Sequence, residues 1–177
     1  KKVLYDIEMS KTNRLFSIIK LKNDSKITNS LVINTTDKLV ILTSLGRLFK
    51  YKLSNEFIPP MSKQAQGTIL NKLLPEEKIV SCCKCKKNDQ LVLITKRGNF
   101  FNVKESEIYD SHISKLGFID EKIELKKDSY LNLITDNKLC EIITNKGRSA
   151  TINFLKLKID IKNKKYQSNS LDFQKDE

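Results

Sequence analysis

The sequence has few of the residues that interrupt regular structure, and it lacks tryptophan. Its 177 residues include 5 glycines, 3 prolines and 4 cysteines. No apolar run approaches the roughly 18 residues needed to span a bilayer, so we expect no membrane partner. No basic-then-apolar leader opens the chain, and it begins at Lys1 rather than methionine. We therefore expect it to be part of a longer polypeptide.

The few cysteines do not have the spacing of a secreted disulfide framework. Cys82, Cys83 and Cys85 are crowded together and Cys140 is remote, which favours a reducing, cytoplasmic setting. Cys82-x-x-Cys85 is half of a zinc spacing, but no second pair follows and the lone His112 is distant. In a strand Cys83 and Cys85 would share one face. We expect core or boundary cysteines, no metal and no cofactor.

The scarce glycines belong to an internal repeat. Thr-x-x-Gly occurs as "TSLGRLF" at 43–49, "TKRGNFF" at 95–101 and "TNKGRSA" at 144–150. Gly67 and Gly117 follow the first two of these glycines at similar intervals, which leaves no glycine for a phosphate-binding loop. The spacings of 52 and 49 residues are those of a repeated supersecondary unit.

Each Thr-x-x-Gly separates two segments that favour β-strands. Aliphatic and β-branched runs precede it, apolar segments follow it, and a further strand candidate lies ahead of each run. The glycine is expected in the turn, where a positive φ is needed. The runs are 39–42, 91–94 and 140–143; the segments after the glycine are 47–53, 99–103 and 148–157; the earlier candidates are 24–34, 76–86 and 127–135.

These repeats predict an all-β array of propeller-type blades in one domain, residues 1–177. We divide it into a partial unit at 1–36, units at 37–87 and 88–136, and a last unit with a polar tail at 137–177. Because the chain is short for a full ring of such blades, we expect an arc whose edge is covered by the tail or left by truncation.

The charge is strongly unbalanced. Formal net charge is +12, with 33 basic and 21 acidic residues, which indicates a polyanionic partner. Lysine, asparagine and isoleucine are also abundant in proteins from AT-rich genomes, so part of the excess has a compositional explanation. The tail from Asp160 to Glu177 holds four lysines and four acids. The basic excess therefore lies in the repeats.

The second unit resembles a blade of the C-terminal domain of the DNA gyrase A subunit, which is shared with topoisomerase IV. "MSKQAQG" at 61–67 is especially similar to cyanobacterial and plastid members, and a fainter likeness extends from about Asp24 to Leu157. The residues that carry the resemblance are Gly46, Arg47, Pro59, Ser62, Lys63, Gly67, Leu73, Leu74, Glu77 and Ile79.

The resemblance implies a β-pinwheel, whose blades exchange strands and whose basic rim binds and bends double-stranded DNA. The implied role is to present DNA for strand passage by an ATP-dependent type IIA topoisomerase. Its partners would be the remaining A-subunit regions and the ATPase B subunit, in a cytoplasmic, nucleoid-associated or plastid setting. Nothing in this sequence matches the arginine- and glycine-rich heptapeptide of gyrase proper, and the third unit echoes the blade more weakly. Either the blade with that heptapeptide lies upstream, or the chain is a topoisomerase IV-like or degenerate member, so gyrase and topoisomerase IV activity both stay open.

The candidate DNA contacts are the cations at the hairpin turns and in the strand or loop that follows. They would neutralise phosphates without reading bases. The alternative is a propeller-like module for protein contacts. The candidates are Arg47, Lys50, Lys52, Lys63, Lys72, Lys96, Arg97, Lys104, Lys115, Lys146 and Arg148.

Catalysis is not expected in this chain. The family cleaves DNA with a tyrosine preceded by arginine, and none of the five tyrosines has that neighbour. Tyr5, Tyr51, Tyr109, Tyr130 and Tyr166 follow Leu, Lys, Ile, Ser and Lys.

Overall fold

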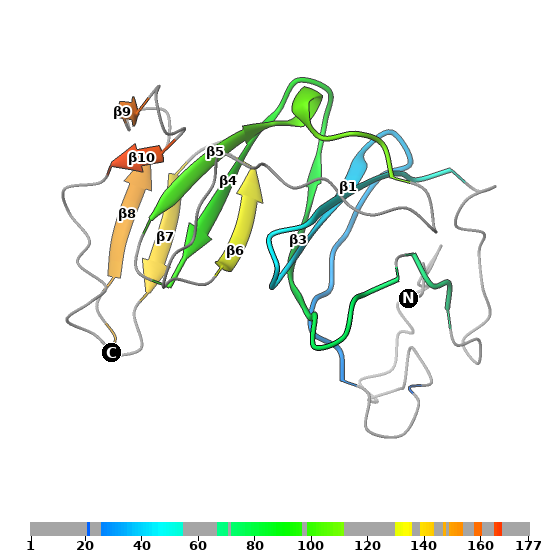
Figure 1. The fold of residues 1–177 in the computed structure, drawn as a ribbon. Helices are drawn as coiled ribbons and strands as arrows, with labels where there is room; N and C mark the ends of the chain where they lie inside the picture. Colours follow the sequence, from blue (N-terminus) through cyan, green and yellow to red (C-terminus); the bar gives the residue numbers. More distant parts are fainter. Residues whose placement is uncertain are drawn as a thin grey trace, which may run out of the picture.

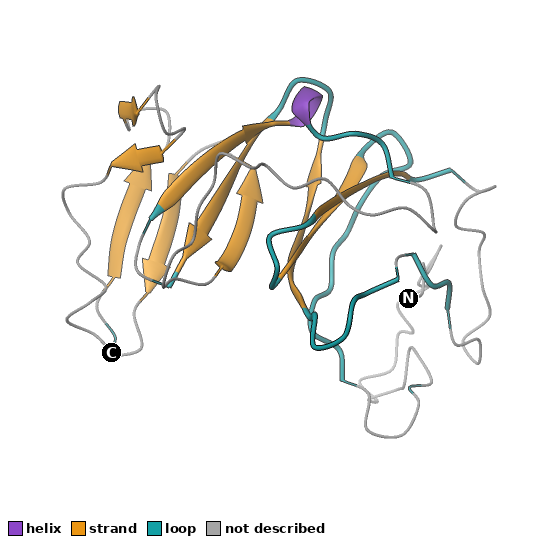
Figure 2. Ribbon diagram, viewed as in Figure 1, coloured by secondary structure: helices purple, strands orange, loops and turns teal. Residues whose placement is uncertain are grey.

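The computed structural model is all-β in the part of the chain that it describes (Figures 1 and 2). That part contains ten strands, which form three antiparallel sheets, and one short 3-10 helix. None of its helices is long and apolar enough to cross a membrane. The described residues are 21, 26–54, 67–70, 72–96, 99–111, 130–135, 139–143, 147, 149–153, 158–160 and 165–167.

Three hairpins form at the predicted Thr-x-x-Gly positions. β1 (Lys38–Thr43) pairs with β2 (Leu48–Lys52), β4 (Gln90–Thr95) with β5 (Phe100–Lys104), and β7 (Leu139–Ile143) with β8 (Ser149–Asn153). The expectation of an all-β repeat is confirmed.

The threonine of the motif closes the turn. The Thr43 amide donates to the carbonyl oxygen of Arg47 at 3.0 Å, and the Arg47 amide donates back to Thr43 Oγ1 at 3.2 Å. Thr95 and Asn99 repeat both bonds, at 3.0 and 3.1 Å. Gly46 has φ +77°, which an L side chain adopts only with strain. Threonine and glycine thus recur because each supplies a different part of the turn.

A third strand completes each of the first two hairpins, and we call it the closing strand. β3 (Ile79–Cys85) pairs with β1, and β6 (Tyr130–Thr135) pairs with β4. Both agree with strand candidates of the sequence analysis. The candidate at 24–34 is different, because its described residues, 26–34, form no strand.

The outer edge of each of these hairpins is covered by the unit that follows. β10 (Lys165–Gln167) pairs with β5 and with β9 (Lys158–Asp160), so part of the last unit joins the second sheet. On the first sheet, Lys50 and Asp110 form a parallel bridge beside β2. Neighbouring units therefore share backbone pairing as well as side-chain contacts.

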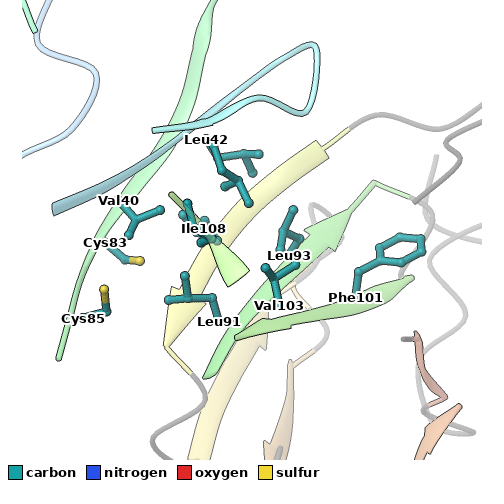
Figure 3. Close-up of a cluster of buried hydrophobic side chains, with 11 residues drawn as sticks. Val40, Leu42, Cys83, Cys85, Leu91, Leu93, Phe101, Val103 and Ile108 are labelled. Carbon is teal, nitrogen blue, oxygen red and sulfur yellow. The ribbon is translucent and has the colours of Figure 1, made fainter. Parts of the chain in front are cut away.

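The main hydrophobic core lies between the first two sheets. It joins Val40 and Leu42 of β1 to Leu91 and Leu93 of β4 and to Leu133 of β6 (Figure 3). A second cluster, around Ile41, Phe49 and Tyr51, covers the other face of the first sheet. Burial on both faces explains why β1 and β4 are continuously apolar rather than alternating.

The cysteines of β3 are part of this packing. Cys83 and Cys85 face the main core, whereas Cys82 packs against the second cluster, as the strand period requires. Burial raises the pKa of the Cys83 thiol, and it raises that of Cys85 to about 12. No group of three or more metal-ligating side chains occurs among the described residues.

Candidate nucleic-acid interface

Arg47 is buried rather than directed at solvent. Its side chain is 2% exposed, its Nε donates to Glu77 Oε1 at 2.7 Å, and its second terminal nitrogen pairs with Glu77 Oε2. The guanidinium also lies 5.0 Å from the centre of the Phe49 ring. The placement of Arg47 on a phosphate-binding rim is therefore corrected, because its charge is used inside the blade.

The environment of Glu77 shows how tightly this pair is held. Burial alone opposes ionisation of Glu77, but hydrogen bonds from Arg47, Thr43 and the Leu74 amide outweigh it and lower its pKa to about 2. The Leu74 amide lies 2.8 Å from Glu77 Oε2. Arg47 and Glu77 thus join the turn of the hairpin to the segment that leads into the closing strand.

Lys50 is a second correction. Only 6% of its side chain is exposed, and its Nζ lies 2.7 Å from Glu105 Oε1 and 3.0 Å from the Glu105 carbonyl oxygen. Lys38 reaches the same carboxylate oxygen at 2.6 Å. Burial opposes the charge of Glu105, but the hydrogen bonds from Lys38 and Lys50 prevail and lower its pKa to about 2. Glu105 belongs to the 3-10 helix η1 (Glu105–Glu107), so Lys50 ties one blade to the next.

Four of the predicted contacts are exposed on the described surface, and they fall at two ends of the sheets. Lys72 and Lys96 lie at the turn end: the Lys72 carbonyl accepts from Arg47, and Lys96 directly follows β4. Lys52 and Lys104 lie at the opposite end, where they close the β2 and β5 ladders in equivalent positions. The Lys52 side chain is 71% exposed, with Asp110 at 3.4 Å.

The remaining predicted cations cannot be placed in this way. Lys63, Arg97, Lys115, Lys146 and Arg148 lie outside the described residues. Of the predicted set, four lysines are therefore exposed among the described residues, whereas Arg47 and Lys50 are buried.

Five exposed lysines of the described residues were not predicted as contacts: Lys26, Lys78, Lys84, Lys86 and Lys87. Lys78 lies at the turn end, where its carbonyl accepts from the Ser44 amide at 2.8 Å. Lys84 projects from β3 between the two buried cysteines, and Lys86 and Lys87 occupy the turn before β4. The alternation of cysteine and lysine at 83–86 could have identified Lys84 as exposed. Residues two apart share a strand face, so Lys84 lies on the face opposite to Cys83 and Cys85.

The repeated combination of a hairpin and a closing strand defines the class of the molecule, an all-β array of propeller-like blades. Residues 37–82 and 89–108 match the family described as "DNA gyrase C-terminal domain, beta-propeller". This match contains all of β1, β2, β4 and β5 and the first residues of β3. It confirms the resemblance to the C-terminal domains of the gyrase A and topoisomerase IV subunits.

Solved structures share this fold at low sequence identity. The C-terminal domain of DNA topoisomerase IV has a TM-score of 0.72 and 19% identity, covering 90% of this chain and 50% of that one. A DNA gyrase A C-terminal domain gives 0.57 and 17%, covering 78% and 50%. The E. coli ParC C-terminal domain gives 0.54 and 14%, covering 80% and 57%. The chain thus spans about half the length of these domains, and no curated protein matches it.

Proposed function

We propose that this chain binds double-stranded DNA without sequence preference, bends it on a basic surface, and presents it for strand passage by a type IIA topoisomerase. The observation that carries the proposal is the match of both described blades to the gyrase C-terminal family. The net charge of +12 supports it independently.

The proposed contacts are the cations that are not used inside the blades. Lys52, Lys72, Lys96 and Lys104 are exposed, and an exposed ammonium can neutralise a phosphate and release its counterion. Lysine acts here as a point charge, which suits binding without base readout. Lys63, Arg97, Lys115, Lys146 and Arg148 complete the proposed set.

We place the principal contact at the turn end of the sheets. Lys72 and Lys78 lie at that end of the first sheet and Lys96 at that end of the second, and Arg97, Lys146 and Arg148 belong to the equivalent turns in the sequence. A surface that repeats from blade to blade can follow a bent duplex. Bending costs on the order of 1–6 kcal/mol over 20–30 base pairs, which several phosphate contacts can offset.

The chemistry of strand passage is assigned to other parts of the enzyme. In this chain the Tyr51 hydroxyl donates to the Leu70 carbonyl oxygen at 2.8 Å, and burial raises the pKa of that phenol to about 12. A buried, neutral phenol is unsuited to attack a phosphodiester. We propose a non-catalytic role, with the remaining A-subunit regions and the ATPase B subunit as partners in a cytoplasmic, nucleoid-associated or plastid setting.

Two double variants with the same change in charge test the proposal and its location. Lys72→Ala with Lys96→Ala removes the turn-end pair, and Lys52→Ala with Lys104→Ala removes the opposite pair. We would measure binding to duplexes of unrelated sequence over a series of salt concentrations. The turn-end variant should bind all duplexes more weakly and flatten the slope of log affinity against log salt by about 0.9 for each lost phosphate contact.

The controls separate function from location. A larger loss in the Lys52 and Lys104 variant would move the interface to the opposite end of the sheets. Absence of binding by the unmodified chain at low salt would refute DNA binding and favour the protein-contact module. Two variants with unchanged affinity and slope would refute both pairs of lysines as phosphate contacts. End-labelled duplexes should show reduced end-to-end distance on binding, which measures bending directly.

A further inference from the structure

The turn of the first hairpin differs from the other two at its tip. The residue before the turn glycine is Leu45 in the first hairpin, whereas it is Arg97 in the second and Lys146 in the third. The residue after the turn threonine is Ser44 in the first hairpin and Lys96 in the second. The first turn therefore presents an apolar side chain where the equivalent turns carry cations.

Leu45 is exposed although the turn around it is firmly held. It is 53% exposed. The Gly46 amide donates to the Thr43 carbonyl oxygen at 3.0 Å, and the Ser44 amide donates to the Lys78 carbonyl oxygen at 2.8 Å. The Lys78 amide donates back to Ser44 Oγ at 3.1 Å. Because the backbone on both sides of Leu45 is fixed, a ligand that covers the side chain has little of it left to order.

Exposed lysines are bonded to both limbs of this turn. Lys78 is bonded to Ser44, ahead of the tip, and the Lys72 carbonyl oxygen accepts a hydrogen bond from Arg47, after the tip, at 3.3 Å. Both lysine side chains are exposed. The tip thus combines one apolar side chain with neighbouring cations. A nucleic-acid duplex has the matching chemistry, because phosphates run along its edges and a stack of bases lies between them.

We propose that Leu45 acts as a wedge, which enters the minor groove and partly separates two stacked base pairs where a bound duplex passes the first turn. This inference rests on the proposed DNA binding and specifies how the bend is made. Leucine is one of the side chains that proteins insert between base steps, and partial unstacking kinks the duplex. Lys72 and Lys78 would neutralise phosphates near the kink.

The three turns would then have different roles. Arg97 and Lys146 would contact phosphates, whereas Leu45 releases no counterion and contributes through insertion. The bend would be concentrated at the first turn, because it is the turn with an apolar tip. Insertion forms no hydrogen bond to a base edge, so it is compatible with binding without sequence preference.

Leu74 provides a matched control at the same end of the first sheet. It is 45% exposed, close to the exposure of Leu45. Its amide donates to Glu77 Oε2 at 2.8 Å, and its carbonyl oxygen accepts from the Glu77 amide at 3.1 Å. Leu74 therefore belongs to the turn before β3 and not to the hairpin tip. Its replacement removes the same kind of exposed side chain without removing the wedge.

The test compares an intact duplex with a duplex of the same length that carries one central mismatch. A mismatched step is already partly unstacked, so insertion costs less there. The unmodified chain should bind the mismatched duplex about tenfold more tightly. Leu45→Ala should abolish this preference and reduce the bending of end-labelled intact duplexes. It should leave the slope of log affinity against log salt unchanged, because the leucine neutralises no phosphate.

Two further substitutions at the tip separate a wedge from a purely structural residue. Leu45→Met keeps an apolar side chain of a kind that proteins also insert, so it should keep the preference for the mismatch. Leu45→Arg copies the tip of the second turn. It should steepen the salt slope by about 0.9 for an added phosphate contact, while the preference and the bend are lost. Leu74→Ala should retain both, and all variants should unfold at the temperature of the unmodified chain.

The outcomes distinguish this inference from the proposed function. A Leu45→Ala chain that keeps the preference and the bend would overturn the wedge and leave DNA binding intact, as would equal affinity of the unmodified chain for the two duplexes. A preference lost equally in Leu74→Ala would assign the effect to the apolar surface of this end and also overturn the role of Leu45. Failure of the unmodified chain to bind either duplex at low salt would overturn the proposed function and the wedge together.

Discussion

Arg47 and Glu77 are 30 residues apart in the chain and form a buried ion pair that binds a hairpin turn to the approach of its closing strand. Both residues belong to the set that carries the resemblance to the gyrase family. Their geometry explains that pattern structurally, because a carboxylate and a guanidinium with two hydrogen bonds between them hold the sheet together. The charge of Arg47 is thus used inside the blade, where Glu77 is its partner.

Removing one member of this pair should destabilise the fold strongly. Arg47→Ala leaves the Glu77 carboxylate buried without its cation, and we expect a loss of about 3–5 kcal/mol in the free energy of unfolding. Urea unfolding monitored by circular dichroism measures it. Replacing both, Arg47→Met with Glu77→Leu, should recover a large part of the loss. A single variant within about 1 kcal/mol of the unmodified chain would contradict the structural role of the pair.

Stability should fall in acid through Glu77 and Glu105. Both carboxyls have a folded pKa of about 2, below the ordinary value of 4.5, so the folded state binds protons less readily than the unfolded one. Their contribution is complete above pH 4.5 and is lost as the pH falls towards 2, by at most roughly 3 kcal/mol for each group. Unfolding free energies measured between pH 7 and pH 2 test this. The Arg47→Met, Glu77→Leu chain should lose about half of the acid dependence, and an unchanged curve would count against it.

The turn threonines should require their hydroxyl groups rather than their shape. Thr95→Val keeps the branched side chain but leaves the Asn99 amide without its acceptor at Oγ1. We expect a loss of about 1–3 kcal/mol, while Thr95→Ser, which keeps the acceptor, should lose less. Thermal unfolding of both variants measures the difference. Equal stability of the Val and Ser variants would show that the hydroxyl contributes nothing.

The glycine of the third turn should be required for its backbone conformation alone. Gly147 has φ +77°, and a Cβ built there meets nothing within 4 Å. Gly147→Val should therefore cost about 1–2 kcal/mol through backbone strain without any clash, and Gly147→Asn should cost less because asparagine tolerates this region. Chemical denaturation of the two variants provides the measurement. A Val variant as stable as the Asn variant would be inconsistent with strain at this turn.

The sequence was sufficient for features that depend on neighbouring residues. A turn closed by threonine and glycine involves five consecutive positions, so Thr43 to Arg47 can be identified from the chain alone. The closing strands β3 and β6 were also detectable, because their apolar content repeats at a nearly constant spacing. The resemblance of the first full unit to a gyrase blade rests on the same kind of local pattern.

Tertiary structure alone decided which cations remain available to a ligand. Arg47 and Lys52 look alike in the sequence, since both lie in or near a hairpin turn or its second strand. Arg47 is neutralised by a carboxylate 30 residues away and Lys50 by one 55 residues away, whereas Lys52 stays exposed. Burial of a charge depends on what the fold brings to it over such distances, because desolvation must be offset by a specific partner, and that partner is not encoded in the local pattern.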